Sequence, residues 1–379
     1  MGLTIGVLKE TFPGERRVAM VPRGMDPLTK AGAQIWIESG AGVEAGVPDK
    51  EYEAKGATVA SAEEVRRNAQ ILFYVRVQDS RALAKGQVVI GMCDPLSDAP
   101  LIANLAQRGI TLFAMELIPR ITRAQSMDVL SSMASIAGYK AVLIAANTLP
   151  RLFPMMTTAA GTIPPARVLV IGAGVAGLQA IATARRLGAV VSGYDVRSAV
   201  KEQIESLGAK FVSIDVKAEG EGGYARALTD DEIHRQREQM AAVLRENDVV
   251  ITTAAVPGRK APILITAPMA RGMTPGSVIV DIAAERGGNC ELTRPGETVV
   301  DNGVNIMGPV NLASTVPFHA SQLYARNLAT FLKNMTAKDG QLNINMDDEI
   351  VRETLVARNG EVVHPKVRVL VDSLTGVHV

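Results

Sequence analysis

Three glycines spaced G-x-G-x-x-G stand where a buried strand is expected to end and a helix to begin. Gly172, Gly174 and Gly177 follow the apolar run at residues 168–171. Such a turn lets the backbone approach a pyrophosphate and points the free N–H groups of a helix N-terminus toward it. Asp195 follows a second expected strand, at the place where a carboxylate accepts hydrogen bonds from a ribose. Together these residues predict dinucleotide binding.

The acidic residue also bears on which dinucleotide is bound. The carboxylate of Asp195 suits a ribose with free hydroxyls and repels a 2′-phosphate, so NAD(H) is favoured over NADP(H). Arg197 follows two residues later and could pair with a phosphate. The simpler interpretation of Arg197 is a solvated surface charge.

The elements around this turn form a strand-helix-strand unit and then continue as a sheet. A helix is expected from Val175 to residue 187, closed by Gly188. The expected strands are residues 168–171, 189–193, 211–214, 249–253, 278–281 and 304–307. The pattern predicts a six-stranded doubly wound sheet.

The N-terminal third of the chain alternates strand and helix signals in the same way. The expected strands are residues 4–8, 33–38, 71–75, 88–90 and 110–115, and the expected helices are residues 27–31 and 100–107. Such alternation is typical of a parallel sheet flanked by helices. This region has no glycine fingerprint, so we expect it to carry no dinucleotide of its own. Residues 340–379 are polar and mixed and carry no clear pattern.

Two long helical stretches connect these regions. Residues 126–146 are rich in small side chains, and residues 317–333 form the second stretch. The predicted fold class is α/β, with two Rossmann-like doubly wound parallel-sheet domains joined by two long helices. The first, discontinuous domain comprises residues 1–127 and 318–379, and the dinucleotide-binding domain comprises residues 128–317.

Composition sets further limits. The chain has 379 residues, 47% of them hydrophobic and 21% charged, with a net charge of +1. Nothing in this balance favours binding to nucleic acid or to an anionic membrane surface. We see no apolar run near the roughly 20 residues that span a bilayer, so we expect no direct membrane insertion.

The segment at residues 115–132 gathers polar side chains at the expected domain junction. These side chains are Arg120, Arg123, Gln125, Asp128 and Ser131. Asp128 and Ser131 are three residues apart and share a helix face, and a glutamine suits a nicotinamide carboxamide. The alternative is a surface salt bridge that caps a helix.

A second polar segment, residues 219–231, interrupts the dinucleotide-binding domain. It is long for a connection between a strand and a helix, and such loops often close over a site. Tyr224, beside Gly223, and Arg226 are the side chains expected to dock, and Gln236 lies about two turns into the next helix. The alternative is a solvated insertion.

The histidines and cysteines offer no catalytic or metal-binding set. His234, His319, His364 and His378 are not adjacent to a carboxylate or a nucleophile, and no Cys/His spacing predicts a metal site. A dehydrogenase that oxidises an alcohol or amine needs a group that moves a proton. Hydride transfer between two nicotinamides needs no such group, only two rings held face to face.

Several segments resemble a known family. They are KETFPGERRVAMVP, MELIPRITRAQSMDVLSS, MMTTAAGTIPPARVLVIGAGVAGLQAIATARRLGA and VIVDIAAERGGNC. They are similar to the NAD(H)-binding component of proton-translocating nicotinamide nucleotide transhydrogenase, in the alanine dehydrogenase/transhydrogenase family. The resemblance runs over nearly the whole chain and is weakest near residues 71–96 and in the tail. It implies NAD(H) in a cleft between two Rossmann-like domains.

The resemblance also implies roles for individual residues. The loop with Arg120, Gln125, Asp128 and Ser131 matches the nicotinamide side of the family's site, where these side chains orient the ring. The matching adenosine-side and further cofactor contacts are Val175, Asp195, Val196, Arg197, Gln236 and Ala255. Gly223 and Tyr224 match a mobile loop, in which the tyrosine is expected to exclude water.

The implied reaction is direct hydride transfer between NADH and NADP⁺, coupled to proton translocation. The resemblance implies that NADP(H) is bound by a partner subunit, and this chain has no second fingerprint. The resemblance implies a homodimer that associates with a membrane-spanning α2-type subunit and an NADP(H)-binding β subunit. The expected location is cytoplasmic, peripheral on the cytoplasmic face of the inner membrane.

Two alternatives stay open. Alanine dehydrogenases resemble this chain in fold and in the PGERRVA region, and they use a Lys and a His in the first domain. The chain has residues 73–76, Phe-Tyr-Val-Arg, in place of the Lys, and residues 92–95, Met-Cys-Asp-Pro, in place of the His, although Arg17 is present. The other alternative is a non-catalytic NAD(H) sensor.

Overall fold

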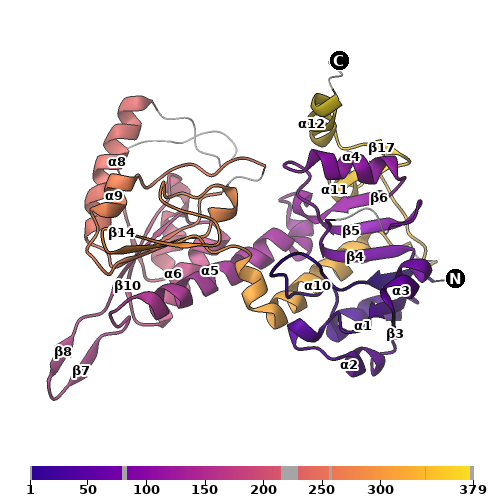
Figure 1. Cartoon of the computed structure of the whole chain (residues 1–379), viewed down its shortest axis with the longest axis horizontal. Helices are drawn as coiled ribbons and strands as arrows, with labels where there is room; N and C mark the ends of the chain where they lie inside the picture. The colour runs from indigo at the N-terminus through magenta and orange to yellow at the C-terminus, as the bar shows by residue number, and fades with distance from the viewer. Residues whose placement is uncertain (1, 79–82, 215–228, 256–257, 338, 376–379) are drawn as a thin grey trace. The chain divides into compact units, whose positions relative to one another are not determined.

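The computed structural model describes residues 2–78, 83–214, 229–255, 258–337 and 339–375. The chain divides into two compact units, one formed by Met1–Met133 with Ser314–Val379 and the other by Ala134–Ala313. Each unit contains one large, mainly parallel sheet with helices around it (Figure 1). The predicted α/β class with two Rossmann-like sheets is therefore confirmed.

Six parallel strands form most of the sheet of the first unit. They are β1 (Thr4–Val7), β2 (Gln34–Glu38), β3 (Thr58–Ala60), β4 (Ile71–Arg76), β5 (Val88–Met92) and β6 (Thr111–Ala114). Their spatial order is β3-β2-β1-β4-β5-β6. The strand order reverses between β1 and β4, which is the switch point of a doubly wound sheet. Ile5 and Val7 on one face and Leu72 on the opposite face are fully buried, as both covered faces of a parallel sheet require.

The tail, which carried no clear pattern in the sequence, completes this sheet. The strands β16 (Leu355–Arg358) and β17 (Glu361–Val362) add to β6 in antiparallel orientation. Asn359 and Gly360 join them with φ values of +55° and +90°. An Asn-Gly pair in this conformation is a strong hairpin signal, so this hairpin was open to prediction from its turn residues.

Helices cover the sheet of the first unit. They are α1 (Pro22–Lys30), α2 (Asp49–Glu53), α3 (Ala62–Asn68), α4 (Ala99–Gln107), α10 (Pro317–Asn334), α11 (Glu349–Thr354) and α12 (Pro365–Thr375). The helix expected at residues 27–31 begins five residues earlier, because Pro22 starts it at its first position. Short 3₁₀ turns lie at η1 (Val43–Ala45), η2 (Met115–Leu117) and η3 (Thr122–Met127), with η7 (Leu312–Thr315) at the unit boundary.

Within the described residues, the sheet of the second unit has seven strands, one more than predicted. They are β9 (Arg167–Ile171), β10 (Val190–Tyr194), β11 (Lys210–Phe211), β12 (Val249–Thr252), β13 (Val278–Asp281), β14 (Thr298–Asp301) and β15 (Val304–Met307). Their order is β11-β10-β9-β12-β13-β15-β14. The additional strand β14 is antiparallel to β15 and is joined to it by Asn302 and Gly303, both at positive φ. This is again a two-residue Asn-Gly hairpin.

Helices lie on both faces of this second sheet. They are α5 (Val129–Thr148), α6 (Val175–Arg186), α7 (Lys201–Ser206), α8 (Asp230–Arg245) and α9 (Ala267–Arg271), with the 3₁₀ turns η4 (Ser198–Val200) and η6 (Ala284–Arg286). Val168 and Val170 of β9 belong to one buried cluster, and Leu169 and Ile171 belong to another. The alternation places one core on each face of the sheet. A separate exposed hairpin, β7 (Met156–Thr158) with β8 (Gly161–Ile163), projects from this unit (Figure 1).

The helix α5 differs from the expectation that no apolar stretch of the chain is long enough to span a bilayer. By length and apolar composition it could cross a membrane, and it is the one helix of the described residues that meets this criterion. The many alanines of α5 count as apolar, but in the sequence they do not look like a long hydrophobic run. A membrane-spanning stretch was therefore not expected here. Of its most apolar window, 39% is buried inside the protein. A core helix of a water-soluble protein meets the same criterion.

Candidate functional site

The turn between β9 and α6 requires glycine at its first position. Gly172 has a φ of +98°, which side-chain-bearing residues rarely adopt. A Cβ there would lie 2.5 Å from Thr253 Oγ1. The N–H of Gly172 donates to the carbonyl oxygen of Tyr194 at 2.8 Å, which fixes the turn against β10.

The second glycine leaves open space at the N-terminus of α6. Gly174 is the N-cap residue and has no side chain to cap the helix. A Cβ on it would meet no atom within 4 Å, and Val175 beside it is 43% exposed. The first N–H groups of a helix have no partners within the helix and lie at its positive end. The turn therefore offers an accessible, unobstructed site for a pyrophosphate.

The third glycine brings the helix close to the strand. A Cβ on Gly177 would lie 1.8 Å from the carbonyl oxygen of Gly172. On the other side of α6, a Cβ on Gly138 of α5 would lie 2.0 Å from the carbonyl oxygen of Ala176. The start of α6 is thus held in place by two backbone approaches that only glycine permits.

Asp195 lies directly after β10 and is engaged in bonds within the protein. Its Oδ1 accepts from the N–H and the Nε of Arg197, each at 2.9 Å. Its Oδ2 accepts from the N–H of Ala173 at 2.8 Å and from Nη2 of Arg197 at 2.9 Å. The interpretation of Arg197 as a solvated charge is therefore wrong, because a tight turn brings its guanidinium onto the nearby carboxylate.

These contacts decide the ionisation of Asp195. Burial alone would raise the pKa of its carboxyl. The hydrogen bonds from the Arg197 guanidinium and from the N–H groups of Ala173 and Arg197 outweigh burial and hold the pKa below its ordinary value. Asp195 is therefore ionised at neutral pH, and its charge both orders the glycine-rich turn and holds Arg197.

Some of the remaining residues predicted to contact the cofactor from the second unit lie within the described residues, and others do not. Val196 is half-buried beside Asp195, and Ala255 is exposed three residues beyond the end of β12. Gln236 lies on α8. Gly223, Tyr224 and Arg226 lie outside the described residues. The structure thus brings Gly172, Gly174, Gly177 and Asp195 together around one turn.

The predicted nicotinamide-side residues lie in the first unit. Arg120 and Gln125 are exposed. Asp128 accepts the N–H of Ser131 at 2.9 Å through Oδ1 and the hydroxyl of Ser131 through Oδ2. Asp128 therefore caps the N-terminus of α5, which is the capping role considered as the alternative.

Arg123, from the same segment, binds residues in the C-terminal part of the chain. Its Nη2 lies 2.6 Å from Oδ1 of Asp348, and its Nη1 lies 3.1 Å from Oδ2 of Asp348 and 3.1 Å from Oδ1 of Asn334. The bidentate contact lowers the pKa of Asp348. Arg123 thus anchors the start of α11, while Arg120 has no ion-pair partner among the described residues.

The carboxyl ends of the first sheet carry buried charges. Arg17 pairs with Glu15 through Nε at 2.7 Å and Nη2 at 2.6 Å, and both side chains are almost fully buried. Arg76, at the end of β4, lies 4.4 Å from the ring centre of Phe12. Arg17 therefore serves a buried ion pair.

Glu116 follows β6, at the same end of the sheet. Its Oε1 accepts from the N–H groups of Cys93 and Asp94 at 2.7 and 2.6 Å. Its Oε2 is buried and has no hydrogen-bond partner within the described ranges of the chain. Burial raises the pKa of Glu116 to about 7.

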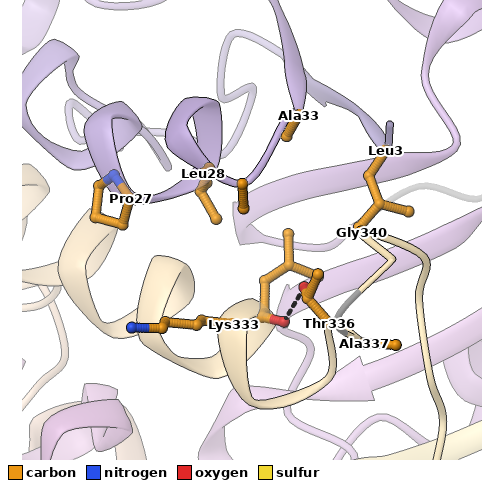
Figure 2. A pocket seen from close by; sticks show the side chains of 10 residues that line it. Leu3, Pro27, Leu28, Ala33, Lys333, Thr336, Ala337 and Gly340 are labelled. Carbon is orange, nitrogen blue, oxygen red and sulfur yellow. Dashed lines mark hydrogen bonds between the residues drawn. The ribbon is translucent and has the colours of Figure 1, made fainter. Parts of the chain in front are cut away.

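Two further features of the described residues do not belong to the site. No group of three His, Cys, Asp or Glu side chains is placed to hold a metal ion within the described ranges. A largely apolar cavity of about 230 Å³ lies in the first unit, lined by α1, the turn after it and the end of α10, and Figure 2 shows Leu28, Lys333 and Thr336 at its wall. None of the predicted site residues lines it.

Three residues near the glycine-rich turn were not singled out from the sequence. The hydroxyl of Thr253 donates to the carbonyl oxygen of Gly172 at 3.1 Å. Asn289 and Asp281 are fully buried; Asn289 accepts from the N–H of Ala254 in the loop after β12, and Asp281 accepts from the N–H of Asn289. The only sequence signal was the Gly-Gly-Asn run after β13, because the contacts of Thr253 with Gly172 and of Asn289 with Ala254 join residues 81 and 35 positions apart.

Comparison with known proteins gives consistent results. The family model "Alanine dehydrogenase/PNT, N-terminal domain" matches residues 6–137, and "Alanine dehydrogenase/PNT, C-terminal domain" matches residues 141–365. The chain is 48% identical over 377 residues to the first part of the NAD(P) transhydrogenase subunit alpha of Rhodospirillum rubrum, covering 96% of this chain and 98% of that protein.

Two solved structures are also similar to the chain. A transhydrogenase from Sinorhizobium meliloti matches with a TM-score of 0.86 and 46% identity, covering 95% of this chain and 100% of that one. An L-alanine dehydrogenase matches with a TM-score of 0.81 and 26% identity, covering 98% of this chain and 100% of that one.

Proposed function

The chain belongs to the alanine dehydrogenase/PNT family, and we propose that it is the NAD(H)-binding component of a proton-translocating transhydrogenase. In this role it presents NADH to NADP⁺ held by a partner subunit, and hydride passes directly between them, coupled to proton translocation. The 48% identity to a transhydrogenase subunit over almost its full length is the observation that carries the proposal.

The second unit supplies the dinucleotide site. Gly174 leaves room for the pyrophosphate, and the start of α6, including Val175, donates to it. Gly172 and Gly177 set the shape of the turn. Asp195, Val196 and Arg197 bind the adenosine side, and Ala255 and Gln236 make further contacts. The bound nicotinamide supplies the hydride, and the protein supplies position and a dry environment.

The first unit orients the reactive ring. Arg120 and Gln125 are exposed and available to a ligand, and Gln125 pairs with the carboxamide. Asp128 and Ser131 present polar atoms at the N-terminus of α5 while they cap it. Gly223 and Tyr224 lie outside the described residues, and the role proposed for the tyrosine is to exclude water from the site.

The residues at the carboxyl edge of the first sheet favour transhydrogenation over alanine oxidation. Oxidative deamination must move a proton as well as a hydride. At this edge β4 ends in Arg76 and β5 is followed by Cys93 and Asp94, where the alternative needs a Lys and a His. Arg17 is held by Glu15. Hydride transfer between two nicotinamides needs none of these groups.

The assembly follows from the same proposal. Residues 128–317 form the NAD(H)-binding domain, and residues 1–127 with 318–379 form the other domain. Two copies form a homodimer, which docks on a membrane-spanning α2-type subunit and an NADP(H)-binding β subunit. The chain is then cytoplasmic and peripheral on the cytoplasmic face of the inner membrane.

A reconstitution tests the reaction. The purified chain is mixed with the NADP(H)-binding domain of a transhydrogenase, NADPH and the acetylpyridine analogue of NAD⁺, and reduction of the analogue is followed by absorbance. We expect rapid reduction that requires both proteins. Reduction of NAD⁺ by alanine with the chain alone would instead establish an alanine dehydrogenase. NADH binding without turnover in either assay would support the sensor.

A further inference from the structure

Asn289 uses both polar groups of its side chain to hold the loop that follows β12. Its side-chain Oδ1 accepts from the N–H of Ala254 at 3.0 Å. Its Nδ2 donates to the carbonyl oxygens of Ala254 at 2.8 Å and of Pro262 at 2.9 Å. The side chain therefore joins the beginning and the end of the segment from Ala254 to Pro262, and it is fully buried while doing so.

Asp281 holds Asn289 in turn. The Oδ2 of Asp281 accepts from the N–H groups of Asn289 at 2.7 Å and Cys290 at 3.0 Å and from the Thr293 hydroxyl at 2.7 Å. The chain can wrap round this carboxylate because a glycine precedes Asn289. Gly288 has a φ of +80°, and a Cβ on it would lie 2.7 Å from Oδ2 of Asp281.

The same loop is tied to the glycine-rich turn at its other side. Thr253 lies next to Ala254, and its hydroxyl donates to the carbonyl oxygen of Gly172 at 3.1 Å. The Thr253 N–H also continues the strand pairing by donating to the carbonyl oxygen of Ile171 at 2.9 Å. A continuous set of hydrogen bonds thus links the ends of β13, β12 and β9 through Asp281, Asn289 and Thr253.

These strand ends lie where the strand order reverses, between β9 and β12. In a doubly wound sheet a dinucleotide crosses this point, with its adenosine over one half and its nicotinamide over the other. The glycine-rich turn and β10 belong to the adenosine half, and the loop after β12 belongs to the nicotinamide half.

We propose that Asn289 is a positioning residue for NAD(H), which fixes residues 253–255 against the glycine-rich turn so that they bind the nicotinamide half of the dinucleotide. This inference rests on the proposed function. It assigns Asn289 no direct contact with the ligand: its effect passes through the backbone of Ala254. A preformed loop binds more tightly because it loses less conformational freedom on binding.

The experiment compares Asn289→Ala with Asn247→Ala. Asn247 is also a buried asparagine of this unit, but its Nδ2 donates to the carbonyl oxygen of Val243, and it precedes β12 at the opposite edge of the sheet. NADH and 5′-AMP are titrated by calorimetry on the full chain, and thermal unfolding is measured without ligand. We expect Asn289→Ala to weaken NADH about tenfold or more, since three hydrogen bonds are lost, and to change 5′-AMP affinity by less than about twofold.

The control and the remaining outcomes separate positioning from general stability. Asn247→Ala should lower the unfolding temperature and leave both affinities unchanged. Equal losses for NADH and 5′-AMP in Asn289→Ala, or no loss for NADH, would overturn the inference. If the unchanged chain binds no NADH, the proposed function fails instead.

Two further variants keep the test decisive if Asn289→Ala does not fold. Asn289→Asp retains an acceptor for Ala254 but places an oxygen against two carbonyl oxygens, so we expect a similar loss for NADH alone. Thr253→Val removes the bond that ties the start of the loop to Gly172 and should give the same selective loss. Unchanged NADH binding in both variants would contradict the proposal.

Discussion

Arg197 and Asp195 form a bidentate ion pair, with Nε and Nη2 of the arginine each 2.9 Å from a carboxylate oxygen. The N–H groups of Ala173 and Arg197 occupy further acceptor positions of the same carboxylate. A carboxylate has about four such positions, so a ribose hydroxyl must share or displace one of these donors. Asp195 thus acts on the ligand and on the turn that binds the pyrophosphate.

The pair predicts opposite effects of two substitutions on nucleotide preference. Asp195→Ala removes the charge that repels a 2′-phosphate and frees Arg197, so NADH should bind about tenfold more weakly while NADPH binding improves. Arg197→Ala leaves an uncompensated carboxylate, so NADPH should bind still more weakly than it does to the unchanged chain. Fluorescence titration with NADH and with NADPH measures the ratio of the two affinities in each variant. A preference that stays the same in both variants would remove the pair from nucleotide selection.

Local patterns in the sequence predicted much of the fold. The fingerprint from Gly172 to Asp195 has its strand, helix and second strand next to one another in the chain, so apolar runs and glycines suffice to place them. The parallel strands β1, β2, β4, β5 and β6 of the first unit were found for the same reason. The strands of the two large sheets that were missed are β3, β14, β16 and β17, and for the last three the Asn-Gly turns were the better signal.

The contacts of the site could not be predicted in the same way. The pairing of Arg123 with Asp348 joins residues 225 positions apart, and the bonds of Asn289 to Ala254 span 35 positions. Nothing in the local sequence distinguishes these partners from other polar residues, because the fold alone brings them together. Residue type indicated which side chains can bond, but not with which partners.

The capping role of Asp128 allows its catalytic role to be tested separately. Asparagine is as good an N-cap as aspartate, so Asp128→Asn should retain the unfolding temperature, whereas Asp128→Ala should lose about 1 kcal/mol of stability. If the carboxylate also orients the nicotinamide, Asp128→Asn and Arg120→Ala should slow hydride transfer about tenfold or more while changing NADH affinity much less. Stopped-flow reduction of the acetylpyridine analogue provides the rates. Unchanged rates in Asp128→Asn would leave Asp128 as a cap only.

Glu116 predicts a pH dependence of stability. Burial raises the pKa of Glu116 from 4.5 to about 7 in the folded chain, so the folded state binds a proton more tightly than the unfolded state. The contribution of Glu116 to the free energy of unfolding is therefore fully present below about pH 4.5 and is lost as the pH rises through about 7. Glu116→Gln mimics the protonated acid and should remove about 1–3 kcal/mol of this pH dependence. The free energy of urea unfolding is measured at about pH 5 and about pH 8 for the unchanged chain and for Glu116→Gln. If it changes equally between the two pH values in the two proteins, the assignment is contradicted.

The glycine-rich turn predicts that two alanine substitutions separate folding from binding. A methyl group on Gly177 would lie 1.8 Å from the carbonyl oxygen of Gly172, so Gly177→Ala must push α6 away from β9 and should cost about 1–3 kcal/mol or more of stability. A methyl group on Gly174 would meet no atom of the protein within 4 Å, and the φ of Gly174, −78°, is open to alanine. Gly174→Ala should therefore keep the unfolding temperature while weakening NADH about tenfold or more, because the methyl group occupies the space for the pyrophosphate. Thermal unfolding and NADH titration of both variants check this, and normal NADH binding by Gly174→Ala would mean that the pyrophosphate lies elsewhere.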